Sequence, residues 1–198
     1  MAQPQKGNRM KASDARAALL EAAHHLFYRQ GLRATSIEEL LEEAGVARQT
    51  LYLHFSTKEG LIAEYLSQRD AQWRSNMRNH VSAHAKTPQA QLLTVFDYLA
   101  HWFSEPAFHG CAFTNAAIEY ADPQHPFHVI AAEHKRQMQT YLEELCRAAQ
   151  LPTPEALARQ LLLLLDGAIV TAQIFPGPRA AIEARQIAAL LLQHGGQP

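Results

Sequence analysis

The stretch TSIEELLEEAGVARQTLYLHFSTKEGL, residues 35–61, decides the fold of the N-terminal part of this chain. It holds two short segments whose apolar residues recur at helical spacing, and the segments meet at Gly45. Glycine allows a sharp turn there because it has no Cβ to clash in a left-handed backbone. Two short helices joined by such a turn are typical of a helix-turn-helix, which we place at about Ile37 to Phe55.

Polar residues predict where each helix begins. Residues 35–39, Thr-Ser-Ile-Glu-Glu, fit a capping box in two registers, with the cap at Thr35 or at Ser36. Ser56 fits a further capping box, which opens a long helix towards residue 80 or beyond. Ala47 stands where the second short helix needs a cap, and alanine caps poorly, at a cost of about 1 kcal/mol. The start of that helix is therefore the one irregular position of the unit.

The polar residues of the second short helix point to DNA. A preceding helix, Ala15 to Gln30, would cover the apolar face and leave the polar face outward. The start of a recognition helix usually meets base edges. Arg48 can pair with guanine, Gln49 with adenine, and Thr50 can touch a thymine methyl group. The residues that suit phosphate oxygens are Tyr52, His54 and Lys58, together with the amides of a helix that begins near Thr35 or Ser36.

Residues 15–65 resemble the TetR family of bacterial regulators, because glycine, tyrosine, histidine, phenylalanine, lysine and glutamate all fall in its register. The resemblance implies a homodimer that binds a palindromic operator, usually as a repressor released by a small ligand. It also implies phosphate contacts from Thr35, Tyr52, His54 and Lys58, and specificity positions at Arg48, Gln49 and Thr50. Ala47 departs from the family, in which many members have Ser or Thr. The alternative is an amphipathic helix pair without a DNA role.

The remaining sequence predicts an all-α fold of about nine helices with no strand. The expected organisation is a flexible N-terminal arm at 1–14, a DNA-binding domain at 15–60, and a ligand-binding and dimerisation domain at 61–198. We expect the later helices at about 88–104, 108–120, 127–149, 154–175 and 179–194, separated by proline- and glycine-rich turns.

Composition limits the class of protein. The 198 residues carry a formal net charge of -1, so any attraction to nucleic acid must be local. Residues 1–36 are locally basic and can supply this attraction, because they contain six basic residues and only two acidic ones. Two cysteines make no disulfide framework, and no secretory signal is visible, so we expect a cytoplasmic protein. The apolar run at 161–165 ends at Asp166, which favours a buried helix over a membrane span.

No enzyme fingerprint is present. The sequence has no nucleophile elbow, phosphate-binding glycine loop, metalloprotease motif or dinucleotide fingerprint, so we predict no catalysis and no cofactor. Eleven histidines raise the possibility of a metal site. Zinc needs three or four converging ligands, and no strong ligand motif appears, so we predict none.

The last two helices are the predicted homodimer interface. The segment 154–175 is too apolar to face water widely. The segment 179–194 has a stripe of small residues, which would let helices approach closely across a two-fold axis. The alternative is packing within one subunit. The stripe consists of Ala181, Ala184, Ala188 and Leu191, with Ile182, Ile187 and Leu190 beside it.

Residues 109–119 resemble a Gly-Cys-apolar-apolar-x-Asn segment of one subgroup of the family, in which this helix lies between the ligand pocket and the DNA head. Cys111 has three alternative roles: core packing, lining of a ligand pocket, or reaction with electrophiles or oxidants. A reactive thiol needs a helix N-terminus or nearby cations.

A hydrophobic or aromatic small molecule is the expected effector. Most aromatic residues of the body can be ordinary core residues, yet some are expected to line a cavity with a few polar anchors. Whether the protein represses or activates is left open. The candidate ligand-binding residues are Trp73, Trp102, Phe103, Cys111, Thr114, Asn115 and Phe175.

Overall fold

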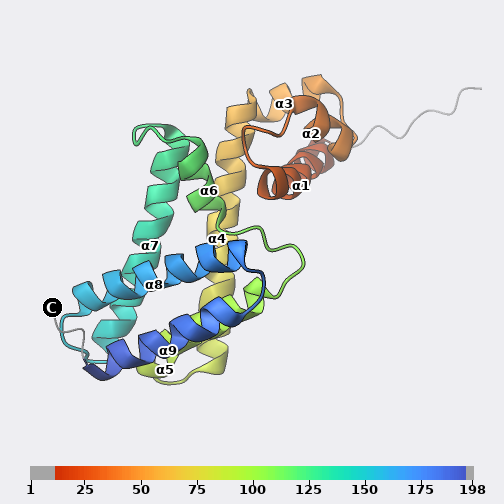
Figure 1. Ribbon diagram of the computed structural model, residues 1–198. Coiled ribbons are helices and arrows are strands. Elements are labelled where there is room, and N and C mark those ends of the chain that lie inside the picture. Colours follow the sequence, from red (N-terminus) through yellow and green to blue (C-terminus); the bar gives the residue numbers. More distant parts are fainter. Residues whose placement is uncertain (1–11, 195–198) are drawn as a thin grey trace, which may run out of the picture. The chain divides into compact units, whose positions relative to one another are not determined.

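The computed structural model describes residues 12–194, and every regular element in that range is an α-helix (Figure 1). Nine helices and no strand occur among the described residues, which confirms the all-α prediction. Residues 1–11 and 195–198 lie outside the described part, so most of the predicted arm at 1–14 does too. Its last three residues belong to the first helix. Two compact units divide the chain, one up to Tyr65 and one from Leu66, here called the head and the body.

The head packs three helices and the start of a fourth around one small core. These are α1 (Ala12–Gln30), α2 (Ile37–Ala44), α3 (Arg48–Phe55) and α4 (Lys58–His84). Helix α1 contacts both α2 and α3 and so forms the platform on which they pack. The buried side chains of this core include Leu19, Leu26, Phe27, Leu40, Leu51, Phe55 and Leu61.

The caps resolve the alternative registers. Ser36 caps α2, with its hydroxyl accepting from the Glu39 amide while the Glu39 carboxylate accepts from the Ser36 amide, so the register that begins at Thr35 is wrong. Gly45 ends α2 at a φ of 63°, in the left-handed region as predicted. The prediction of Ser56 as the cap of α4 is also wrong. Ser56 ends α3, and the Thr57 hydroxyl accepts from the Gly60 amide.

The body consists of the rest of α4 with α5 (Pro88–Phe103), α6 (Ala112–Glu119), α7 (Pro126–Ala148), α8 (Pro154–Ile174) and α9 (Arg179–His194). Helix α7 contacts α5, α6 and α8, while α9 packs on α5 and α8. Helix α6 begins four residues later than the sequence suggested. Residues 108–111 therefore form a non-helical approach that leaves Cys111 at the N-cap of α6.

Helix α9 packs differently from the prediction. Ala181, Ala184 and Ala188 are buried within the body, so these small residues do not form an exposed stripe. Ile182 and Ile187 are instead about half exposed. Small residues let α9 approach its own neighbours closely, and the larger aliphatic residues remain for an outer face.

Helix α8 is long and apolar enough to cross a membrane by length and composition, and 39% of its most apolar window is buried inside the structure. It packs on α7 and α9, as a core helix of a helical bundle does.

Candidate functional site

The inward face of α3 is apolar, and its outward face is polar except for Leu53, which is 78% exposed. Leu51 and Phe55 are buried in the head core. Because α3 has 3.6 residues per turn, this packing directs the intervening residues away from the core. Arg48 and Gln49 are exposed, Tyr52 is 43% exposed, and Thr50 and His54 are partly exposed. The five residues proposed from the sequence for this helix thus share one accessible surface.

Arg48 already has a partner on the surface of the head. Its guanidinium pairs with the Glu38 carboxylate of α2, and both side chains are at least half exposed. A hydrogen bond with Tyr52 and the charge of Glu38 raise the pKa of Arg48 above its ordinary value. An incoming base or phosphate must therefore replace the Glu38 contact.

Two predicted phosphate contacts, Thr35 and Lys58, form hydrogen bonds with the loop between α1 and α2. Thr35 is fully buried, and its hydroxyl donates to the Gly31 carbonyl at 2.8 Å. The Lys58 ammonium donates to the Leu32 carbonyl at 2.8 Å, although its side chain is partly exposed. The Thr35 side chain is therefore not on the accessible surface expected of a phosphate contact, because the turn after α1 uses its hydroxyl. Ser36 is partly exposed at the start of α2.

A second candidate site is a cavity inside the body. Its volume is about 10 Å³, which is room for about one water molecule. A larger guest would have to displace side chains. The cavity is lined by Arg69, Trp73, Trp102, Cys111, Ala112, Phe113, His134, Lys135, Met138, Leu165 and Ile169.

The aromatic and thiol residues that were predicted to bind a ligand separate into three groups. Trp73, Trp102 and Cys111 line the cavity. Phe103 is buried beside Trp102 without lining it. Phe175 is 73% exposed at the end of α8 and does not line the cavity.

The two proposed polar anchors lie on α6. The Asn115 amide donates to the His109 carbonyl at 3.2 Å and so supports the approach to α6. Thr114 is close enough to Cys111 to help lower the pKa of its thiol. Neither residue is among those that line the cavity.

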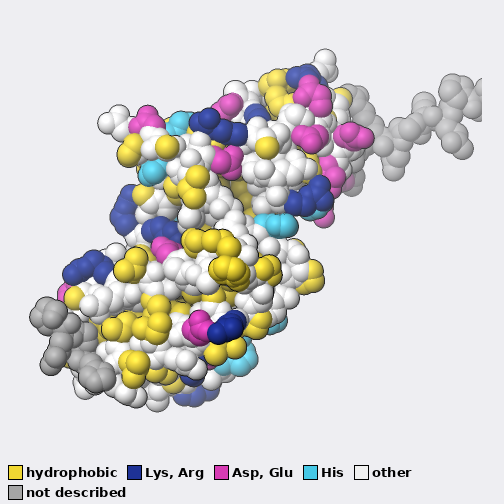
Figure 2. Space-filling view, in the orientation of Figure 1, with side chains coloured by type: hydrophobic (Ala, Val, Ile, Leu, Met, Phe, Trp, Pro, Cys, Tyr) yellow, Lys and Arg dark blue, Asp and Glu magenta, His cyan; other side chains and the backbone are white. Residues whose placement is uncertain are grey.

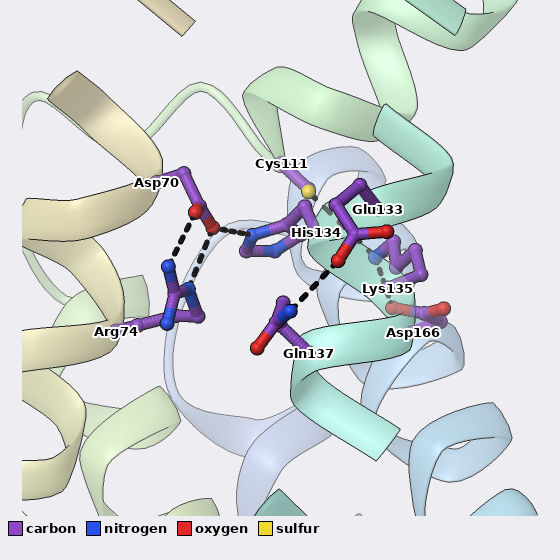
Figure 3. Close-up of polar contacts among 8 residues, drawn as sticks. All are labelled: Asp70, Arg74, Cys111, Glu133, His134, Lys135, Gln137 and Asp166. Atoms are coloured by element: carbon purple, nitrogen blue, oxygen red, sulfur yellow. Dashed lines mark hydrogen bonds and ion pairs between the residues drawn. The ribbon is translucent and has the colours of Figure 1, made fainter. Parts of the chain in front are cut away.

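Charged side chains from three helices surround Cys111 (Figure 3). Asp70 of α4 accepts from Arg74 at 2.6 Å and pairs with His134 Nδ1 of α7 at 2.7 Å. Lys135 of α7 pairs with Asp166 of α8 at 2.5 Å, and its Nζ lies 3.7 Å from the Cys111 sulfur. We call these six residues the thiol cluster.

The cluster stabilises the ionised form of Cys111. Burial alone would raise the pKa of this thiol, but the Lys135 charge, a hydrogen bond and charge from His134, and a hydrogen bond from Thr114 lower it to about 6. The pKa of His134 shifts in the opposite direction. Burial lowers its pKa, yet Asp70 and Cys111 raise it above the ordinary value. These opposite shifts favour a thiolate–imidazolium pair of Cys111 and His134 over the neutral pair.

His134, Lys135 and Asp70 are site residues that were not predicted from the sequence. One signal was available: Asp166 interrupts an apolar helix, and a carboxylate there needs a cation. The spacing of Asp70 and Arg74, four residues apart, also predicts an ion pair on one helix face. No sequence signal brings His134 to Asp70, because 64 residues separate them.

The histidines do not form a metal site in the described part of the chain. Among residues 12–194, no group of three or more His, Cys, Asp or Glu side chains could hold a metal ion. His80 and His84 instead stack with ring centroids 4.1 Å apart.

Comparisons with known proteins match both units. Residues 19–65 match the family described as "Bacterial regulatory proteins, tetR family", and residues 88–188 match "Tetracyclin repressor-like, C-terminal domain". The HTH-type transcriptional regulator YjdC of Escherichia coli (strain K12) is 27% identical over 154 residues, 76% of this chain and 79% of that protein. The HTH-type transcriptional repressor ComR of the same organism is 28% identical over 136 residues, 67% of this chain and 64% of that protein.

A solved structure supports the same family match. The crystal structure of a TetR-family transcriptional regulator from Streptomyces coelicolor superposes with a TM-score of 0.82 at 33% identity, covering 93% of this chain and 97% of that one.

Proposed function

This chain belongs to the TetR family of bacterial transcriptional regulators, and we propose that within it the protein is a repressor that a small molecule releases from a palindromic operator. The observation that carries the effector part is the aromatic and charged cavity inside the body, which is a different compact unit from the head that carries α3. The relative ComR is named a repressor, which supports the direction of control. A cytoplasmic location follows from the role on chromosomal DNA.

DNA reading is assigned to residues 15–60, and effector binding with dimerisation to residues 61–198. Arg48, Gln49 and Thr50 are proposed to contact base edges, because they stand exposed or partly exposed at the start of α3. Ser36, Tyr52, His54 and Lys58 are proposed to contact phosphates. The Thr35 side chain is left out of this set because it is buried.

The proposed homodimer interface is the outer face of α8 and α9. Figure 2 shows hydrophobic side chains gathered over these helices. Leu163 is 75% exposed, and a groove between the two helices includes Leu163, Gly167 and Ile187. Exposed apolar patches of this kind are typical of protein interfaces. A two-fold axis would bring the same face of a second copy onto it.

The head can be tested by removing Arg48 and Tyr52 together, with an operator fragment that the wild type selects from random DNA. We expect the double alanine variant to remain a folded dimer and to lose at least about tenfold in operator affinity, since a good base contact contributes about 1–3 kcal/mol. Arg136→Ala, an exposed arginine of α7, is the matched control. Unchanged affinity in the double variant would reject α3 as the reading helix.

The direction of control needs a separate assay. A reporter promoter that overlaps the selected operator should lose expression when the protein is present. Expression that rises instead would identify an activator.

A second candidate for the signal is covalent, through Cys111, in response to electrophiles or oxidants. The cations beside its sulfur favour this reading. Release of operator DNA by a mild electrophile should occur in the wild type and be lost in Cys111→Ser. Equal release from both proteins would exclude Cys111 as the sensor.

A further inference from the structure

We propose that Cys111, His134 and Asp70 act together as a nucleophile, a proton carrier and an orienting carboxylate that add the Cys111 sulfur to a small conjugated carbonyl compound. The inference rests on the proposed function, in which the body cavity is the effector site. It names the chemical class of the effector and two positioning residues.

Asp70 orients the His134 ring. One Asp70 oxygen binds His134 Nδ1 at 2.7 Å, and Arg74 binds both carboxylate oxygens, at 2.8 and 2.6 Å. The ring also stacks on Phe113, with centroids 3.8 Å apart and an interplanar angle of 14°. Because Nδ1 is occupied, Nε2 is the nitrogen left for Cys111. Figure 3 shows His134 between Asp70 and the sulfur, the order that a nucleophile, its base and an orienting group require.

Helices α4, α6, α7 and α8 contribute to the charge environment of the thiol, while α5 supplies the uncharged Trp102. Helix α4 supplies Arg69, Asp70 and Arg74, and α7 supplies His134 and Lys135. Helix α8 supplies Asp166, which neutralises part of the Lys135 charge. Cys111 itself is at the N-cap of α6, where the helix dipole favours an anion. The positive groups next to the sulfur therefore outweigh the negative ones.

The cavity walls define the kind of molecule that fits. Trp73, Trp102 and Phe113 line it, so a flat conjugated molecule that displaces some of the lining side chains would stack against aromatic rings. The Trp73 indole Nε1 is buried and has no hydrogen-bond partner among residues 12–194. A buried donor without an acceptor is costly, and a carbonyl oxygen would satisfy it. An enal, enone or quinone offers a flat π system, a carbonyl oxygen and an electrophilic carbon together.

The reaction balances without an oxidant or a leaving group. The thiol proton moves to His134, which becomes imidazolium. The thiolate lone pair forms a carbon–sulfur bond at the β-carbon while the Cα–Cβ π bond breaks, and its electrons move to the carbonyl oxygen. The enolate oxygen accepts a hydrogen bond from Trp73. The α-carbon then takes the proton from His134, which leaves a thioether and a neutral imidazole.

The adduct changes the charge pattern of the body. The thioether is neutral, so Lys135 loses an anionic neighbour. His134 returns its proton, so Asp70 loses its imidazolium partner. Asp70 lies on α4 and Asp166 on α8, and covalent addition therefore disturbs contacts that connect three helices. Such a loss of buried charge pairing is a physical basis for a change between two conformations.

The test uses methyl vinyl ketone as the probe on the full-length protein, with butanone as the saturated control. The rate of mass addition is followed from pH 5 to pH 9. Wild type should react at Cys111 with a midpoint near pH 6. The midpoint is the diagnostic quantity, because a lower thiol pKa also lowers intrinsic nucleophilicity and so compresses differences in absolute rate. Butanone should give no stable adduct.

Variants separate a positioning role from a merely structural one. His134→Gln should raise the midpoint by at least about one pH unit, a tenfold change in thiolate fraction at a pH between the two midpoints. Asp70→Asn preserves the shape of the side chain and should shift the midpoint in the same direction. Cys146→Ser is the matched control and should leave the profile unchanged. A wild-type midpoint near that of a free thiol, or midpoints unmoved in both variants, would overturn the proposal.

Operator binding is measured on the same samples, which keeps the two hypotheses distinguishable. Addition at Cys111 followed by release supports both. Addition with the expected pH profile but no release supports the chemistry and rejects the cavity as the effector site.

Discussion

Replacing Gly45 by alanine tests whether the turn of the helix-turn-helix depends on a left-handed backbone. Gly45 has a φ of 63°, and among the described residues no atom lies within 4 Å of the position that a Cβ would occupy. The added methyl group therefore meets no obstacle. Any loss of stability must come from the backbone conformation itself.

The magnitude follows from two opposing terms. A left-handed conformation costs an L-residue about 1–2 kcal/mol. Alanine also restricts the unfolded chain, which returns about 0.4–1 kcal/mol. The net expectation is a head destabilised by about 1 kcal/mol. Asparagine tolerates the left-handed region better than alanine, so Gly45→Asn should lose clearly less.

Hydrogen exchange of peptides within residues 19–65 measures the loss of stability in the head itself. Urea unfolding, followed by far-ultraviolet circular dichroism at a fixed protein concentration, measures the loss of stability of the whole protein. Both tryptophans, Trp73 and Trp102, belong to the body, so their fluorescence provides an internal reference. If the alanine variant is as stable as the wild type, or if the asparagine variant loses as much as alanine, the conformational explanation is refuted.

Three further predictions concern other parts of the chain. Ala47→Ser should supply the missing cap of α3 and stabilise the head by about 1 kcal/mol, seen as a higher urea midpoint; no gain would place the start of α3 elsewhere. Absorbance at 240 nm should reveal a thiolate that forms near pH 6 and disappears in Cys111→Ser, while Cys146 stays protonated at neutral pH because burial raises its pKa to about 11. Leu163→Glu should convert the dimer to a monomer, as measured by analytical ultracentrifugation. A dimer that stays intact would exclude the outer face of α8 and α9 as the dimer interface.

The head could be predicted in detail because its signals are local. Capping involves residues three apart, the glycine turn involves one residue, and the apolar spacing of α2 and α3 extends over eight residues each. Such short-range patterns predict helix bounds and the outward face directly. What remained open or wrong there was also local: of the two candidate caps of α2 the structure selects Ser36, and Thr57 rather than Ser56 caps α4.

Side-chain burial was harder to predict, because several partners compete for each residue. The sequence indicates that Thr35 is polar and Phe175 is aromatic. It does not show that the Thr35 hydroxyl is used by the Gly31 carbonyl, or that α8 ends before Phe175 can turn inward. The small residues of α9 were equally suited to either side of that helix.

By itself, the sequence determined the all-α class, the helix-turn-helix and the outward face of α3, since these depend on residues a few positions apart. Only the tertiary structure decided the body site. His134 meets Asp70 across 64 residues, and Lys135 meets Asp166 across 31. A buried charge is stable only beside its partner, and which partner it finds depends on how whole helices pack.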